Sequence, residues 1–346
     1  MDKMKNDGLG EFDKIWTDVR GFMPVNSRIL ITGANGLVAS NLVDAFMHFN
    51  KKYDTHNHIE AVCRNREKAE KRFVDYVGSD EFSICCQDVC DFELDQPCDY
   101  IFHTASNAHP LAYSIKPIET IKTNVIGTMK ILEYAVKANV KKIVYVSTSE
   151  IYGDKNADTA NERFVETEYG SINTLVPRSC YSESKRCAET VCICYGQEKD
   201  LDIKIVRPGY IYGAQITDEN SRADAQFLRS VIGKSNIVMK SEGLQKRSYC
   251  YVADAVSAMI YVLMKGSAGQ AYNIANSESE ASVREYAEAL AKCGGVEVVF
   301  DIPAEIESKG YSTIKNSLLS DKKLRSLGWK PKYDLNQGVT EMLNKF

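Results

Sequence analysis

The strongest constraint on the fold of this chain is an alternation between short apolar segments, typical of buried strands, and amphipathic segments, typical of helices. Such an alternation predicts a parallel sheet covered by helices on both faces, which is a doubly wound α/β fold. The predicted strands are Arg28–Thr32, Ile59–Cys63, Glu81–Cys86, Asp99–Ala105, Lys141–Ser147 and Leu201–Pro208. Four helices are predicted between these strands. The first begins at Leu37, the second is a charged helix that ends at Phe73, the third spans Pro117–Ala138, and the fourth carries Tyr181.

After Pro208 the pattern changes to shorter, mixed elements, with predicted helices at Ala223–Gly233, Val252–Lys265 and Ser282–Cys293. A smaller lobe of this kind packs over the carboxyl ends of the strands, where ligands bind in such folds. We therefore expect three parts. Residues 1–26 form an N-terminal extension with a surface helix, residues 27–207 form a dinucleotide-binding Rossmann domain, and residues 208–346 form a mainly substrate-binding lobe with some segments returning to the Rossmann domain.

Composition excludes several classes of protein. The chain has 346 residues, a net charge of -4 and no long block of Lys or Arg, so we expect no nucleic-acid partner. No apolar run approaches the ~20 residues of a membrane span, and the first residues are too polar for a secretory signal. The eleven cysteines lie mostly inside apolar patterns, and no Cys/His spacing suits zinc. We expect reduced, largely buried thiols, no metal, no membrane partner and a cytoplasmic location.

The segment "TGANGLVA", from Thr32 to Ala39, places a glycine turn between the first strand and its helix. A turn that brings backbone N–H groups against a pyrophosphate needs small residues, and the following helix presents its positive end to the anion. Gly33 permits the turn, Gly36 permits the close phosphate approach, and Ala39 permits tight helix–strand packing. A plain strand–turn–helix corner is the alternative, but the place of the turn after the first strand favours nucleotide binding.

The spacing Gly-x-x-Gly-x-x-Ala resembles the first turn of the extended short-chain dehydrogenase/reductases. Asp88 and Val89 match that family's adenine contact, and the segment "HTAS" from His103 matches the segment under its cofactor. The resemblance implies cofactor contacts from Gly33, Asn35, Gly36, Leu37, Val38, Arg64, Asp88, Val89, Thr104, Ala105, Ser106, Tyr181, Lys185 and Pro208. Members that use NAD usually carry an Asp after the second strand, where this chain has Cys63 or Arg64. An arginine there suits the extra phosphate of NADP, or stacks on adenine with NAD bound, so NAD is expected and NADP stays open.

A threonine, a tyrosine and a lysine form the predicted catalytic set. Tyr181 and Lys185, four residues apart, share one helix face, and Thr148 ends the fifth strand. A tyrosine in water ionises at about pH 10, but a nearby ammonium and a charged nicotinamide would lower that pKa toward the working range. The three residues reproduce the superfamily's Thr/Ser…Tyr-x-x-x-Lys set, which implies that Tyr181 is the base and that Thr148 binds the substrate hydroxyl.

The neighbouring segments resemble nucleotide-sugar enzymes, and UDP-glucuronate decarboxylases above all. The matching segments are "STSEIYG", "SCYSESKRCAET", "KPIETIKTNVIGTMKILEYA", "QKRSYCYVADAVSAM" and "LGWKPKYDLNQGV". The resemblance implies that Arg247 reaches the sugar nucleotide and that Ser149 contacts the substrate. It also implies that Glu150 is catalytic, as a base at sugar C5, although a solvated end-of-strand carboxylate is the alternative. Two segments depart from the decarboxylase pattern, "VRPGYIYGAQ" with Tyr210 and "SNAHP" with His109, so a sugar or nucleotide other than that of UDP-glucuronate stays open. His109 contacts the substrate or caps a loop.

We predict an enzyme that modifies a nucleotide-diphosphate sugar by transient NAD-dependent oxidation at C4. UDP-glucuronate decarboxylase-like chemistry leads, followed by 4,6-dehydration or 4-epimerisation. An NADPH-dependent keto-sugar reductase and a non-catalytic nucleotide-binding protein are the remaining alternatives. The resemblance also implies a homodimer formed through the helices at Pro117–Ala138 and Ser179–Gly196, and a role in the synthesis of surface-polysaccharide precursors.

Overall fold

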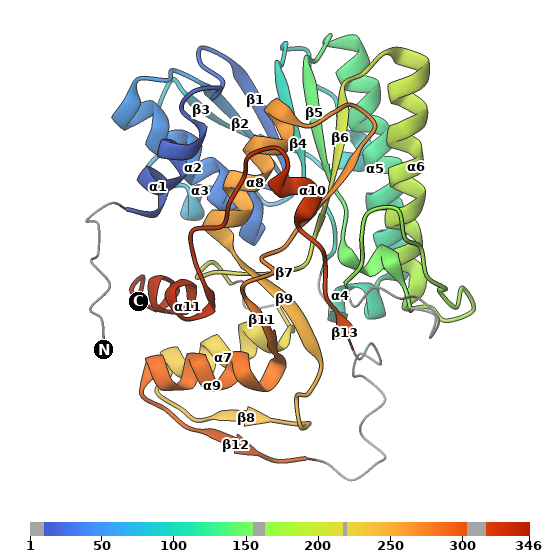
Figure 1. The fold of residues 1–346 in the computed structure, drawn as a ribbon. Coiled ribbons are helices and arrows are strands. Elements are labelled where there is room, and N and C mark those ends of the chain that lie inside the picture. Colours follow the sequence, from blue (N-terminus) through green and yellow to red (C-terminus); the bar gives the residue numbers. More distant parts are fainter. Residues whose placement is uncertain (1–9, 109, 155–162, 217–219, 303–315) are drawn as a thin grey trace.

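A parallel sheet of seven strands forms the centre of the molecule, as the alternation in the sequence predicts (Figure 1). The computed structural model describes residues 10–108, 110–154, 163–216, 220–302 and 316–346. The strand order is β10-β6-β5-β4-β1-β2-β3, and each neighbouring pair is parallel. The strands are β1 (Arg28–Thr32), β2 (His58–Cys63), β3 (Phe82–Cys86), β4 (Tyr100–His103), β5 (Lys142–Val146), β6 (Ile203–Pro208) and β10 (Ala271–Ile274). The doubly wound α/β fold is confirmed.

Helices cover both faces of this sheet and form two cores. One core contains α5 (Pro117–Lys137) and α6 (Ser179–Lys199), and the other contains α1 (Glu11–Val19), α2 (Leu37–Tyr53) and α8 (Val252–Lys265). Successive residues of a strand point to opposite faces, so Leu30 of β1 joins the first core while Ile29 and Ile31 join the second. The shorter helices α3 (Arg66–Arg72) and α4 (Pro110–Ile115) lie in the connections after β2 and β4.

The helix α8, which the sequence groups with the smaller lobe, packs against the central sheet. Every residue from Val252 to Leu263 is buried, and α8 contacts β5, β6, α1 and α2. A helix buried along its whole length needs cover on all sides, and β5, β6, α1 and α2 all contribute to that cover. The following strand β10 then extends the sheet beside β6, so this segment returns to the first domain.

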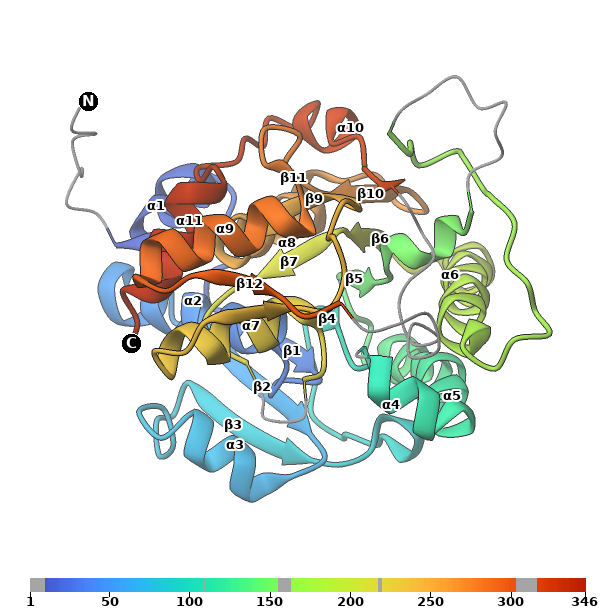
Figure 2. The same cartoon turned by 90° about the horizontal axis from the view of Figure 1, so that it is seen from below.

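The smaller lobe lies at the carboxyl ends of the central strands, below the sheet in Figure 1 and in front of it in Figure 2. Its main sheet is built around β9 (Lys246–Tyr251), with β7 (Tyr210–Tyr212), β11 (Glu280–Ser282) and β13 (Asn316–Ser317). The pair β8 (Ile237–Met239) and β12 (Val298–Phe300) lies beside α7 (Ala223–Ile232) and α9 (Val283–Gly294). The chain ends with α10 (Lys322–Arg325) and α11 (Leu335–Leu343).

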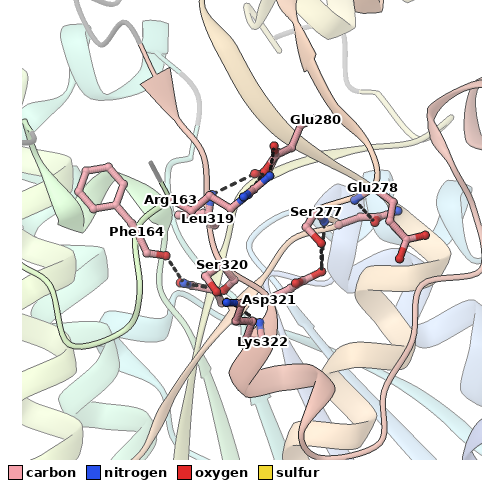
Figure 3. A network of polar contacts seen from close by, with 12 residues as sticks. Arg163, Phe164, Ser277, Glu278, Glu280, Leu319, Ser320, Asp321 and Lys322 are labelled. Carbon is pink, nitrogen blue, oxygen red and sulfur yellow. Dashed lines mark hydrogen bonds and ion pairs between the residues drawn. The ribbon is translucent and has the colours of Figure 1, made fainter. Parts of the chain in front are cut away.

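A polar network joins three distant segments at the edge of this lobe (Figure 3). Arg163 donates to both carboxylate oxygens of Glu280, at 2.5 and 2.7 Å. The Ser320 N–H donates to the Phe164 carbonyl at 2.8 Å, and the Asp321 carboxylate accepts from the Ser277 N–H and hydroxyl, both at 3.1 Å. These hydrogen bonds therefore hold the segments around residues 164, 278 and 320 together.

The described residues agree with the expected thiol state, with one difference. All eleven cysteines are free, as predicted. The prediction that they are largely buried is too broad, because Cys86, Cys187, Cys194 and Cys293 are exposed. Among the described residues, no helix is long and apolar enough to cross a membrane, and no group of His, Cys, Asp and Glu is suited to hold a metal ion.

Candidate active site

A cavity of about 860 Å³ lies between the carboxyl ends of the strands and the smaller lobe. Nearly all the residues that the sequence singled out line it: Gly33, Asn35, Gly36, Leu37, Val38, Arg64, Asp88, Val89, Thr104, Ala105, Ser106, Thr148, Ser149, Glu150, Tyr181, Pro208, Tyr210 and Arg247. Lys185 is buried behind these lining residues, with a relative exposure of 2%. His109 lies outside the described residues. Positions far apart in the sequence therefore converge on one site.

The glycine turn is built to admit a ligand close to the backbone. Gly33 has a φ of 67°, and a Cβ at this position would lie 2.8 Å from the Cα of Ala105, so any other residue would be strained and would clash. Gly36 is the N-cap of α2 and donates its N–H to the Gly33 carbonyl at 2.9 Å. The buried Asn35 Oδ1 has no hydrogen-bond partner within the described part of the chain. A bound dinucleotide whose phosphates lie at this helix N-terminus fits the turn.

The segment after β4 is fixed beside the turn by hydroxyl groups. The N–H groups of Thr104 and Ala105 both donate to Thr32 Oγ1, at 3.0 and 3.1 Å. Ser106 donates to Asn124 at 2.7 Å, and Asn124 donates in turn to Ser184 of α6 at 2.8 Å. The wall under the cofactor cavity is therefore joined to the helix that carries Tyr181.

Arg64, the residue that left NADP open, is engaged by acidic side chains. Its guanidinium donates to Glu119 at 2.7 Å, lies 4.0 Å from Asp88 and donates to Asn107 at 3.3 Å. The 2′-phosphate of NADP would meet these two carboxylates and would compete with them for the same guanidinium. The arrangement fits the uncharged ribose hydroxyls of NAD better.

Two members of the predicted catalytic set, Thr148 and Tyr181, line the cavity, and Lys185 is buried behind them. Tyr181 is 6% exposed and Thr148 is 9% exposed. Burial and then the negative charge of Glu150 raise the pKa of Tyr181, while hydrogen bonds with Thr148 and Ser106 oppose that rise. Burial lowers the pKa of Lys185 to about 7, and its ammonium donates to the Val146 carbonyl at 2.7 Å. The resting phenol is therefore neutral, and a cation bound in the cavity would favour its ionised form.

Glu150 is held by partners rather than solvated. Arg178 donates to its two carboxylate oxygens at 3.2 and 3.5 Å, and Ser182 donates to it at 3.3 Å. The side chain of Glu150 is 25% exposed. To accept a proton from a sugar, Glu150 would have to exchange one of these hydrogen bonds for a contact with the substrate. The role of Glu150 as a base at sugar C5 stays a prediction.

Cations and tyrosines line the part of the cavity that the smaller lobe forms. The guanidinium of Arg247, 3% exposed, lies 4.9 Å from the centre of the Tyr210 ring, and that of Arg222 lies 5.4 Å from the same ring. Sequence reasoning missed Arg222, Arg178 and Tyr113. Arg222 follows a stretch without periodic pattern, whereas Arg178 stands three residues before Tyr181, and that spacing is a signal that could have been used.

The comparisons with known proteins agree with this geometry. The model of the NAD dependent epimerase/dehydratase family matches residues 29–275 of this chain. UDP-glucuronic acid decarboxylase 6 of Arabidopsis thaliana is 30% identical over 94% of this chain and 90% of its own length. UDP-glucuronic acid decarboxylase 3 of the same plant is 31% identical over the same shares.

Solved structures share the fold. A dTDP-glucose 4,6-dehydratase of Bacillus anthracis in complex with NAD has a TM-score of 0.75 and 23% identity, covering 92% of this chain and 96% of that one. A UDP-glucose 4-epimerase of Thermotoga maritima has a TM-score of 0.76 and 23% identity, covering 92% and 97%. From the family match and the relatives at 30% identity, this chain belongs to the NAD dependent epimerase/dehydratase family.

Proposed function

We propose that this protein modifies a nucleotide-diphosphate sugar through transient oxidation at sugar C4, and that its reaction is the decarboxylation of a UDP-uronate. The observation that carries the proposal is the meeting of Thr148, Tyr181 and the buried Lys185 beside a cavity with a glycine turn at one end and Arg247 at the other. Relatives named as UDP-glucuronic acid decarboxylases support the choice of substrate.

Each side chain of the site has its own role in the first step, the oxidation at sugar C4. NAD, when bound, supplies the oxidising power at the sugar carbon. Tyr181 in its ionised form takes the proton of the C4 hydroxyl, and Thr148 holds that hydroxyl by a hydrogen bond. Lys185 holds the end of β5 through the Val146 carbonyl and adds positive charge behind the phenol when protonated. Arg247 pairs with the diphosphate of the substrate.

The pairing of Glu150 favours decarboxylation over dehydration. Once C4 is a ketone, a carboxylate on C5 belongs to a β-keto acid, which loses carbon dioxide without a protein base. Dehydration instead needs a base that removes the C5 proton. Arg178 and Ser182 occupy the Glu150 oxygens, so this carboxylate is a poor candidate for that task. Engagement of Arg64 by Glu119 likewise weighs against an NADPH-dependent reductase.

We also propose how the chain is divided and assembled. Residues 27–207 bind NAD, residues 208–346 mainly bind the substrate, and residues 1–26 are an N-terminal extension. The exposed apolar side chains of Ile118, Ile121 and Ile126 on α5 and Ile193 on α6 support a homodimer through these two helices. The eleven free thiols support action in the cytoplasm, on precursors of surface polysaccharides.

The decisive experiment incubates the protein and NAD with UDP-glucuronate, and with GDP-, CDP- and dTDP-sugars, and weighs the products by mass spectrometry. Loss of carbon dioxide from the uronate is the expected result. Loss of water would establish a dehydratase, and an unchanged mass with a new chromatographic peak would establish an epimerase.

Tyr181→Phe should remove turnover while the affinity for NAD stays within about twofold, because only the acid–base hydroxyl is lost. Substantial residual turnover would overturn the assignment of the base.

A further inference from the structure

The predicted base, Tyr181, is the first of three planar groups that lie in series. The rings of Tyr181 and Tyr113 are stacked, with centroids 5.1 Å apart and an interplanar angle of 20°. The guanidinium of Arg178 lies 5.4 Å from the centre of the Tyr113 ring and donates to the Tyr113 hydroxyl at 3.3 Å. Tyr113 is 2% exposed, so it has little freedom to turn. The Tyr181 ring therefore packs on a neighbour whose ring and hydroxyl both contact Arg178.

The Arg178 guanidinium also pairs with the negatively charged carboxylate of Glu150. Arg178 lies 3.2 Å from one Glu150 oxygen and 3.5 Å from the other. Glu150 acts on Tyr181 as a negative charge that opposes ionisation of the phenol. A guanidinium stays charged at every relevant pH and presents several donors in one plane. It can therefore bind a carboxylate and cover a ring at the same time.

We propose that Arg178 is a positioning residue for the reaction, which fixes the Tyr181 phenol through Tyr113 and neutralises the Glu150 carboxylate beside that phenol. The inference rests on the proposed function, since it concerns the base of that reaction. Arg178 is assigned no contact with the substrate. Its effect is transmitted by one ring and one ion pair.

The charged and titratable groups around Tyr181 come from four elements and one adjoining segment. They are Lys185 and Arg178, on α6 and at its N-cap; Glu150 in the short helix η2 (Ser149–Tyr152); Tyr113 in α4; Tyr145 in β5; and Arg222 at the N-cap of α7. Arg222 favours the ionised phenol, and Glu150 opposes it. Within the part of the chain that the structure describes, Arg178 alone of these groups contacts both Glu150 and the stacked Tyr113 ring.

The pH dependence of kcat/KM tests the charge part of the proposal. In Arg178→Met, the uncompensated Glu150 disfavours the phenolate, so the acidic limb should move upward by about one pH unit. Glu150→Gln should move the same limb downward, and the double variant should return it toward the wild-type position. Arg178→Lys keeps the charge and should move the limb less than Arg178→Met. A limb that stays in place in Arg178→Met, or that the double variant does not restore, would overturn the compensation.

Arg186 provides a matched control on the same helix. It is half-buried and donates to the carbonyls of Ile151 and Gly170 at 2.7 and 2.8 Å. Its hydrogen bonds within the described residues go to these carbonyls and to Glu183, and not to Tyr113 or Glu150. Arg186→Met should therefore leave the acidic limb in place even if it lowers stability. An equal shift in this variant would mean that the limb reports general loosening of the helix, and would overturn the role of Arg178.

Crystal structures of the wild-type protein and Arg178→Met, both with NAD bound, test the positioning part without turnover. We expect the Tyr113–Tyr181 stack to open or rotate in the variant. An unchanged stack would overturn this part of the proposal. Because the comparison needs no sugar nucleotide, it decides the matter even if no tested sugar is converted, an outcome that would instead count against the proposed function.

Discussion

At the residue scale, the substrate side of the cavity is dominated by arginines that are already held in place. Arg222 and Arg247 lie over the same Tyr210 ring. A guanidinium that rests on a ring keeps its orientation before the ligand arrives, so less side-chain entropy is lost on binding. The cavity is therefore prepared for an anionic ligand such as a diphosphate.

Arg247→Ala should weaken the binding of UDP or a UDP-sugar by about 1.5–3 kcal/mol, because a charge-assisted contact with the diphosphate is lost. The affinity for NAD should be nearly unchanged. Isothermal titration calorimetry with UDP and with NAD separates the two effects. Arg284→Ala is a suitable control, because Arg284 is an exposed arginine of the same lobe that pairs with Glu288. Equal UDP affinity in wild type and Arg247→Ala would show that Arg247 does not bind the diphosphate.

At the element scale, the glycine turn leaves no room for a side chain at position 33. Gly33→Ala should destabilise the protein by more than 1 kcal/mol, roughly the cost of a positive φ alone, and should weaken NAD binding at least tenfold. Gly295→Ala is the matched control, because its φ of 71° is similar while a Cβ there would meet nothing within 4 Å. Thermal unfolding and NAD titration measure both effects. Equal losses in the two variants would mean that backbone strain, and not the contact with Ala105, limits position 33.

The two long helices offer a second test at this scale. Ile121→Asp should convert the expected dimer into a monomer, because Ile121 is 44% exposed on α5 and a buried, unpaired carboxylate is costly. Analytical ultracentrifugation gives the mass directly. Val74→Asp is the control, since Val74 is 67% exposed outside α5 and α6. A wild-type protein that sediments as a monomer would remove the proposed dimer.

At the scale of the whole molecule, α1 connects parts of the chain that are far apart. Its Glu11 accepts from the Tyr251 hydroxyl at 2.8 Å and pairs with Lys345 near the chain end. The Trp16 ring stacks on Tyr53 of α2 with centroids 4.2 Å apart. Ile15 and Val19 are buried. The N-terminal extension is therefore part of the second core as well as a surface element.

Asp13→Asn should lower the Tm at neutral pH by several degrees. Burial alone would raise the pKa of Asp13, but bonds from Lys52, His48 and Tyr53 hold it well below its usual range. A depressed native pKa adds stability above the unfolded value of about 4, and that stability is lost as the pH falls further. The difference in Tm between wild type and variant should therefore shrink below about pH 4. Asp95→Asn, at a 99% exposed position, should change the Tm little. A difference that does not depend on pH would contradict the linkage.

Most of the central fold could be predicted because it follows from local patterns. The β1 strand and the α8 helix have the predicted bounds, and α5 differs by one residue from its prediction. The glycine turn and the Tyr-x-x-x-Lys spacing were also readable, since each lies within one turn or one helix. The position of α8 on the sheet and the added strand β10 were less accessible, because local apolarity does not state which surface covers an element.

The parallel sheet, the glycine turn and the predicted Thr148–Tyr181–Lys185 set could all be read from the amino-acid sequence, because periodicity and short spacings specify which side chains share a face. The ion pair of Glu150 and the packing around Tyr181 depend on how distant elements meet in the folded chain. Arg178 meets Glu150 across 28 positions and Tyr113 across 65, and such contacts arise from packing between elements rather than from any pattern within one. Whether a carboxylate is a free base or half of an ion pair is therefore decided by the fold.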